Sequence, residues 1–162
     1  DWSSDVCSSD LTGGNGGIGL GMAKGMARSG ATIVVAGRDA AKNKSAVAEI
    51  EGLGAKASAI PVDVLKEESC RGLFDEAVKK HGRVDILVNN AGMSIRKQPE
   101  QYTLAEWHTV LDSNLTSAFL CSQAAYPAMK KAGGGKIINI GSMMSIFGAA
   151  FATAYEIGRA HV

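Results

Sequence analysis

A helix expected at residues 17–29 opens on the glycine-rich sequence Thr12-Gly13-Gly14-Asn15-Gly16-Gly17-Ile18-Gly19. Glycine tolerates a positive φ and lets the backbone approach a pyrophosphate, which the free N–H groups of a helix N-terminus then bind. A flexible loop has the same composition, so this stretch alone leaves the two explanations equal. Its meaning depends on the segments around it.

Short apolar runs alternate with amphipathic stretches on the C-terminal side of this loop. Strands are expected at residues 32–36, 56–62, 84–89 and 136–140, and helices at 39–53, 66–81 and 104–131, the last divided into two. Apolar strands separated by helices are typical of βαβ units, whose parallel sheet is covered on both faces. The sequence therefore predicts a single α/β domain with a doubly wound parallel sheet.

The residues at the two ends are less regular. Residues 1–11 (DWSSDVCSSDL) and 156–162 (EIGRAHV) do not continue the hydrophobic pattern beside them. Both resemble in-frame translations of a short-read sequencing adapter, so we interpret them as non-native segments, with native tails as the alternative. The domain itself is expected to span residues 12–155. Residues 6–11 are nevertheless expected to fill the position of the first strand.

Three further segments follow the glycine-rich loop in a recognisable order. Asn89-Asn90-Ala91-Gly92 comes directly after an expected strand, Asn114 lies on the next helix, and Ser142 ends the run IINIGS. Tyr155 follows Ser142 by 13 residues. Each residue alone has a structural explanation, as a helix cap, a turn or packing. Together with the loop, they resemble the short-chain dehydrogenase/reductase family over essentially all of residues 12–155.

The resemblance implies a Rossmann-like domain that moves a hydride between a nicotinamide and the hydroxyl or keto group of a small substrate. The family's sheet has the order 3-2-1-4-5-6-7, so we expect a domain that is incomplete after the fifth strand. Ser142 would polarise the substrate oxygen. Tyr155 would transfer the proton, and Asn114 would hold a water molecule. An ordinary tyrosine has a pKa near ~10 and needs nearby positive charge to act as a base at neutral pH.

The family's positive charge is a lysine four residues after the tyrosine, but Arg159 stands there. Arginine is permanently charged and cannot cycle a proton. Because Arg159 belongs to the segment interpreted as non-native, we assign it no role. We expect the parent protein to be the enzyme and this chain itself to be inactive.

The resemblance also implies which residues bind the dinucleotide. They are Gly13, Asn15, Gly17, Ile18, Gly19, Arg38, Asp63, Val64, Asn89, Ala91 and Gly92. An acidic residue at the end of the second strand would favour NAD, whereas a nearby arginine would favour the 2′-phosphate of NADP. Gly37 occupies the place of the acid and Arg38 follows it. NADP is therefore the expected cofactor, with NAD possible, and no metal site is expected.

The substrate is less clearly indicated. Arg96 and Lys97 offer two positive charges to a sugar-acid carboxylate, although a solvated basic loop explains them as well. Stretches such as GGKIINIGSMMS are similar to gluconate 5-dehydrogenases and deoxygluconate dehydrogenases. Three alternatives stay open: a 3-oxoacyl-carrier-protein reductase, a non-catalytic NADP-sensing regulator on the same fold, and a methyltransferase-like Rossmann protein, which the Ser142–Tyr155 spacing disfavours.

The composition and net charge limit the classes of partner that we expect. The 17 basic and 16 acidic side chains leave a net charge of +1, so electrostatics give no reason to expect nucleic acid or an anionic membrane as a partner. No apolar run approaches the ~18 residues of a membrane span. The three cysteines lack metal-ligand spacing and fit a reducing cytoplasm. We therefore expect a cytoplasmic protein with a small-molecule substrate, whose parent is a homodimer or homotetramer.

Overall fold

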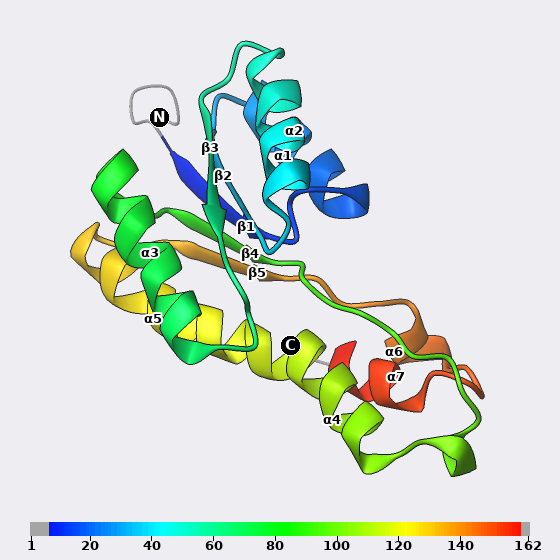
Figure 1. The fold of residues 1–162 in the computed structure, drawn as a ribbon. Helices are drawn as coiled ribbons and strands as arrows, with labels where there is room; N and C mark the ends of the chain where they lie inside the picture. Colours follow the sequence, from blue (N-terminus) through cyan, green and yellow to red (C-terminus); the bar gives the residue numbers. More distant parts are fainter. Residues whose placement is uncertain (1–6, 160–162) are drawn as a thin grey trace.

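The computed structural model describes residues 7–159 and contains one parallel β-sheet (Figure 1). Its strands are β1 (Ser8–Thr12), β2 (Thr32–Gly37), β3 (Ala57–Pro61), β4 (Ile86–Asn89) and β5 (Lys136–Asn139). They lie in the order β3-β2-β1-β4-β5, and every neighbouring pair is parallel. This is the first part of the order expected from the family resemblance.

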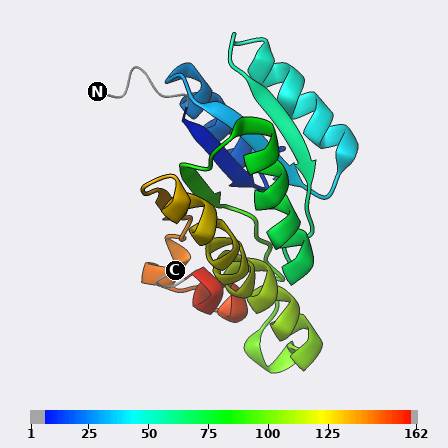
Figure 2. The same ribbon diagram turned by 90° about the vertical axis from the view of Figure 1, so that its left-hand side faces the viewer.

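Helices cover both faces of the sheet. They are α1 (Gly17–Arg28), α2 (Ala40–Glu51), α3 (Glu67–His81), α4 (Leu104–Leu111), α5 (Ser117–Lys131), α6 (Met144–Phe147) and α7 (Thr153–Arg159). One hydrophobic core joins α1 and α2 to the sheet, and a second joins α3 and α5 to its other face. Figure 2 shows α3 and α5 side by side, as their contacts require. The doubly wound α/β fold predicted from the sequence is confirmed.

Strand β1 occupies the centre of the sheet, as expected for the residues before the glycine-rich loop. Residue 6 of that expected strand lies outside the described residues. Ser8 pairs with Thr32, and Leu11 pairs with both Val35 and Val88. All five residues of β1 are buried, although Ser8, Ser9 and Asp10 are poor strand formers. Pairing along both edges places them in the sheet despite this low propensity.

The helical region at residues 104–131 differs in detail from the expected pair of helices. It begins at a capping box formed by Thr103 and Glu106. It then passes from α4 through a π-helical turn at Asp112–Thr116 directly into α5. The two helices are therefore joined by a widened turn, without a loop between them.

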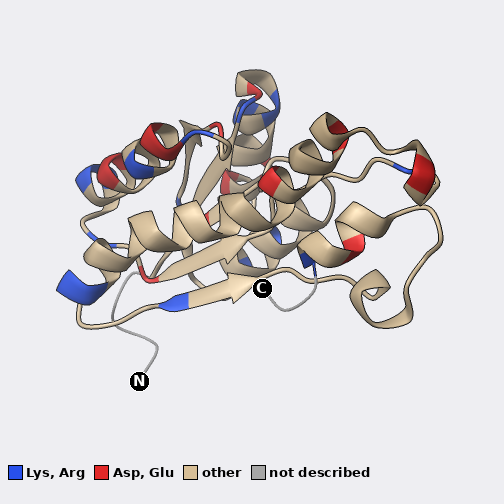
Figure 3. Ribbon diagram, turned by 90° about the horizontal axis from the view of Figure 1, so that it is seen from below, with Lys and Arg blue, Asp and Glu red and all other residues tan. Residues whose placement is uncertain are grey.

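Charged residues lie mainly on the outer helices and loops, with both signs interspersed (Figure 3). Within residues 7–159, no helix is both long enough and apolar enough to span a membrane.

Candidate dinucleotide and catalytic site

The glycine-rich loop and the turn after β4 are held together by Thr12 and Asn90. The Thr12 hydroxyl accepts from the backbone N–H groups of Asn90 and Ala91, at 3.1 Å each. The Asn90 amide donates to the carbonyls of Thr12 and Gly13, at 3.1 and 3.2 Å. The sequence motifs pointed to Asn89 and Ala91 as cofactor residues, whereas the structure shows that Asn90 shapes the loop.

Two glycines in this loop are required for different reasons, one for its backbone conformation and the other for lack of space. Gly13 has a φ of 65°, which favours glycine. A Cβ on Gly19 would lie 2.3 Å from the Gly13 carbonyl oxygen and 2.6 Å from Asn90 Nδ2, so α1 can approach the loop only with glycine there.

The loop is open where α1 begins. A Cβ on Gly16 or Gly17 would meet no described atom within 4 Å, and no side chain caps the helix N-terminus. Ile18, in the first turn, is also exposed. Free N–H groups beside open space fit the phosphates of a dinucleotide.

The residues expected around the adenosine lie at the ends of β2 and β3. Arg38 is exposed and forms no ion pair within residues 7–159. Asp39 caps α2 by accepting from Lys42 N at 3.0 Å. The backbone N–H of Asp63 donates to Ser69 Oγ at 2.9 Å, and Val64 packs against the core beneath it. These residues therefore lie along one edge of the sheet, at the carboxyl ends of β2 and β3.

Asn89 points into the protein, toward α5. Its amide nitrogen donates to Asn139 Oδ1 at 2.8 Å, to Ser122 Oγ at 3.0 Å and to the Ala118 carbonyl at 3.3 Å. This side chain therefore ties β4 to β5 and α5, and its amide nitrogen is fully used in doing so.

Asn114 is buried in the π-helical turn. Its amide nitrogen donates to the carbonyls of Val110 and Met93, at 2.7 Å each. Its Oδ1 has no hydrogen-bond partner among the described residues. A Cβ on Gly92 would lie 2.3 Å from this oxygen, so the loop after β4 passes directly against it.

Arg159, for which no role was expected, is buried in this region. Its guanidinium donates to the carbonyl of Ile140 at 2.6 Å and to those of Asn90 and Ala91 at 3.2 Å each. The guanidinium carbon lies 5.8 Å from the centre of the Tyr155 ring. Arg159 thus attaches α7 to the ends of β4 and β5, a structural contact that was not expected from the sequence.

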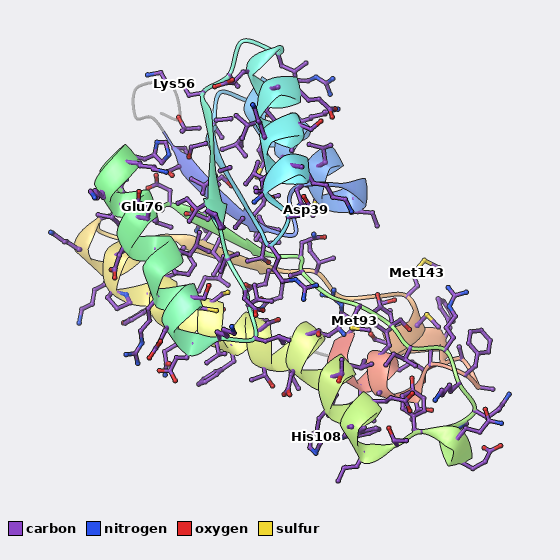
Figure 4. The ribbon with its side chains drawn as sticks, viewed as in Figure 1. Asp39, Lys56, Glu76, Met93, His108 and Met143 are labelled. Carbon is purple, nitrogen blue, oxygen red and sulfur yellow. The ribbon has the colours of Figure 1, made fainter. Side chains whose placement is uncertain are left out.

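Ser142 is not joined to the other candidate catalytic residues by hydrogen bonds. It lies three residues beyond the end of β5 instead of within the strand, and its hydroxyl accepts from Met144 N at 3.2 Å. Within the described chain, that hydroxyl has no hydrogen bond to Tyr155, which is the third residue of α7. Figure 4 shows Met93 and Met143 on the segments that follow β4 and β5.

The two positive charges after Gly92 are already engaged. Lys97 forms an ion pair with Glu106, and hydrogen bonds from Lys97 and Thr103 together lower the pKa of Glu106 to about 2. The guanidinium carbon of Arg96 lies 5.9 Å from the centre of the Phe151 ring. Of these two charges, that of Arg96 is the one that no acidic side chain among residues 7–159 offsets.

Two further features of the surface do not coincide with this site. A groove of about 890 Å³ lies between α3 and α5, lined by residues such as Phe74 and Leu120, and none of the candidate site residues lines it. Among residues 7–159, no group of three or more His, Cys, Asp or Glu side chains has the arrangement of a metal site.

Comparison with known proteins agrees with this geometry. A model of the family described as short chain dehydrogenase matches residues 11–160. A 2-dehydro-3-deoxy-D-gluconate 5-dehydrogenase from Formosa agariphila is 38% identical, over 92% of this chain and 57% of its own length. A 3beta-hydroxysteroid dehydrogenase from Mediterraneibacter gnavus is 35% identical, over 90% of this chain and 52% of its own length.

The fold comparison leads to the same group of proteins. A crystal structure of an NAD+-bound xylitol dehydrogenase superposes with a TM-score of 0.91 at 29% identity, covering 94% of this chain and 59% of the other. The chain thus spans a little over half the length of these proteins.

Proposed function

Because this chain belongs to the short chain dehydrogenase family, we propose that it is the dinucleotide-binding part of an NADP-preferring oxidoreductase. The bound nicotinamide supplies or accepts the hydride, and the substrate is a small molecule with a hydroxyl or keto group. The observation that carries the proposal is the open glycine-rich loop, which Thr12 and Asn90 hold beside the uncapped N-terminus of α1.

The preference for NADP over NAD rests on the end of β2. Gly37 provides no carboxylate for the ribose hydroxyls, and Arg38 is exposed directly after it. An arginine at this position is suited to a 2′-phosphate.

The proposed catalytic roles follow from side-chain chemistry. Ser142 donates a hydrogen bond to the substrate oxygen, Tyr155 transfers the proton, and Asn114 holds a water molecule with its unpartnered Oδ1. Arg159 supplies positive charge beside Tyr155 but cannot pass a proton onward. We therefore propose that this chain transfers protons poorly even where it binds the cofactor.

A sugar acid is the proposed substrate class. The deoxygluconate dehydrogenase from Formosa agariphila supports it, and Arg96 has a charge suited to a carboxylate. The steroid dehydrogenase among the relatives shows that other substrates fit the same framework. Cytoplasmic location and a homo-oligomeric parent stay predictions from the sequence.

Dinucleotide binding is tested by titrating the chain with NADPH and NADH while their fluorescence is recorded. Gly19→Ala places a methyl group 2.3 Å from the Gly13 carbonyl and is expected to weaken NADPH binding by at least about tenfold. Gly21→Ala is the matched control, because a Cβ there meets no described atom within 4 Å. It should leave the affinity within about twofold and stabilise α1 slightly.

Two outcomes would contradict the proposed function. One is the absence of binding of either dinucleotide by a chain that circular dichroism shows to be folded. The other is equal loss of affinity in the two alanine variants, which would place binding outside the loop. A tighter complex with NADH than with NADPH would retain the oxidoreductase assignment and remove the preference for NADP.

A further inference from the structure

Asn43 joins three separate segments around the expected adenosine position. It lies on α2 and is buried. Its amide nitrogen donates to the Gly37 carbonyl at the end of β2, at 2.8 Å. Its Oδ1 accepts from the side-chain amide of Asn15, in the glycine-rich loop, at 2.7 Å. One side chain therefore fixes the relative positions of the loop, the strand end and the helix.

Apart from Asn43, the buried face of α2 is apolar. The other buried residues of α2 are Ala46 and Ile50, three and seven positions further along the same helix face. Burying an amide there costs free energy unless its hydrogen bonds are satisfied, and both bonds of Asn43 are. A polar side chain at this position is explained by the two segments that its hydrogen bonds hold in place, the glycine-rich loop and the end of β2.

The Asn15–Asn43 pair occupies the space in which a side chain at residue 37 would begin. A Cβ on Gly37 would lie 2.5 Å from Asn15 Nδ2 and 2.9 Å from Asn43 Oδ1. The φ of Gly37 is outside the left-handed region, so its backbone suits any residue. The obstruction is therefore the amide pair itself.

We propose that the Asn15–Asn43 pair determines cofactor specificity by excluding an acidic side chain from residue 37. This inference rests on the proposed dinucleotide binding. A carboxylate at this strand end would accept hydrogen bonds from free ribose hydroxyls and would repel a 2′-phosphate. The adjacent carboxylate, Asp39, is held at the N-terminus of α2 by its bond to Lys42 N. With residue 37 kept empty and Arg38 exposed, the edge selects a ribose that carries a 2′-phosphate.

The test measures binding of two probes to the chain by calorimetry: adenosine 2′,5′-bisphosphate and 5′-AMP. The unmodified chain is expected to bind the bisphosphate at least about tenfold more tightly. Gly37→Asp should lose at least about tenfold in bisphosphate affinity without gaining affinity for AMP, because the amide pair still crowds the new side chain. Gly37→Asp combined with Asn43→Ala should bind AMP at least about fivefold more tightly than Gly37→Asp alone, inverting the preference.

Two further variants keep the result interpretable. Gly37→Asp combined with Asn15→Ala removes the nearest obstructing atom without touching the buried Asn43, so it replaces the first double variant if that one fails to fold. Gly72→Asp adds the same charge on α3, where a Cβ meets no described atom within 4 Å. It should leave the ratio of the two affinities unchanged.

The failure of this inference differs from the failure of the proposed function. If Gly37→Asp alone binds AMP as tightly as both double variants, the amide pair excludes nothing and the inference is wrong, while dinucleotide binding stands. If the folded, unmodified chain binds neither probe, the proposed function is wrong and the inference falls with it.

Discussion

At the scale of single residues, Asp10 is the least favourable feature of the fold. It lies in the central strand β1, between Val34 and Leu87, and is fully buried. Neither of its carboxylate oxygens has a hydrogen-bond partner among residues 7–159. Burial, together with the negative charge of Asp85, raises the pKa of Asp10 to about 8. The folded chain therefore keeps this carboxyl group protonated under conditions in which the unfolded chain ionises it.

This difference predicts how stability depends on pH. The unfolded carboxyl titrates near ~3.9. Between about pH 4 and pH 8 the folded chain holds one more proton at Asp10 than the unfolded chain. The contribution of Asp10 to the free energy of unfolding is therefore full below about pH 4. As the pH rises above about 4, this contribution falls by up to ~1.4 kcal/mol per pH unit until the pH reaches the folded pKa of about 8.

Asp10→Val is expected to raise the free energy of unfolding by about 2 kcal/mol or more at pH 7 and to reduce the decline between pH 5 and pH 8. Urea unfolding at both pH values measures the two effects. Asp75→Val is the control, because Asp75 is exposed on α3 and its replacement should change stability by no more than about 0.5 kcal/mol. Equal effects of the two substitutions would show that the carboxyl group of Asp10 has a partner in solution.

The asparagines show which parts of the site could be predicted from the sequence. Asn89 and Asn114 belong to motifs, and in the structure their amides donate to Asn139 and to the Met93 carbonyl. Asn43 belongs to no motif, and its only signal was a polar residue at an apolar position of α2. Arg159 was assigned no role because it lies in the segment interpreted as non-native. Long-range hydrogen bonds to backbone carbonyls, which give both residues their place, leave no local pattern in a sequence.

At the scale of elements, the order of strands and helices was predictable because apolar strands and amphipathic helices have distinct periods. The π-helical turn was not, since it depends on Asn114 reaching the Met93 carbonyl from another segment. Helix α6 has only four residues, too few for periodicity to appear. Helix α7 is attached to the sheet by the hydrogen bonds of Arg159, which join segments far apart in the sequence.

Helix α7 is expected to depend on that attachment. Arg159→Ala removes three hydrogen bonds from a charged donor, each of a kind that contributes about 1.5–3 kcal/mol. Hydrogen exchange of the α7 amides should accelerate by at least about tenfold, while exchange in α2 stays unchanged. Arg71→Ala, which removes an exposed ion pair with Glu67, is the matched control and should alter neither helix by more than about threefold. Unchanged exchange in α7 would mean that packing alone holds this helix.

At the scale of the whole molecule, the sheet has one apolar edge that the described chain does not cover. Within residues 7–159, β5 pairs with β4 alone, so its other side presents free N–H and C=O groups. Ile137 and Ile138 are neighbours on this strand, so their side chains point to opposite faces of the sheet, and they are 40% and 44% exposed. Such an edge is a template for pairing with another chain, and Lys136 is the only charged residue on the strand.

The chain is therefore expected to self-associate through β5 in a concentration-dependent way, which sedimentation velocity between about 5 and 100 µM would detect. Ile138→Lys places a charge on the edge and should weaken the association by at least about tenfold, since the strand would have to bury an ammonium group to pair. Ile146→Lys is the discriminating control, because Ile146 is 80% exposed on α6 and lies outside β5. If Ile146→Lys dissociates the chain as effectively as Ile138→Lys, the contact is a general apolar one and the strand edge does not direct it. A chain that stays monomeric at the highest concentration would show that β5 is protected in solution.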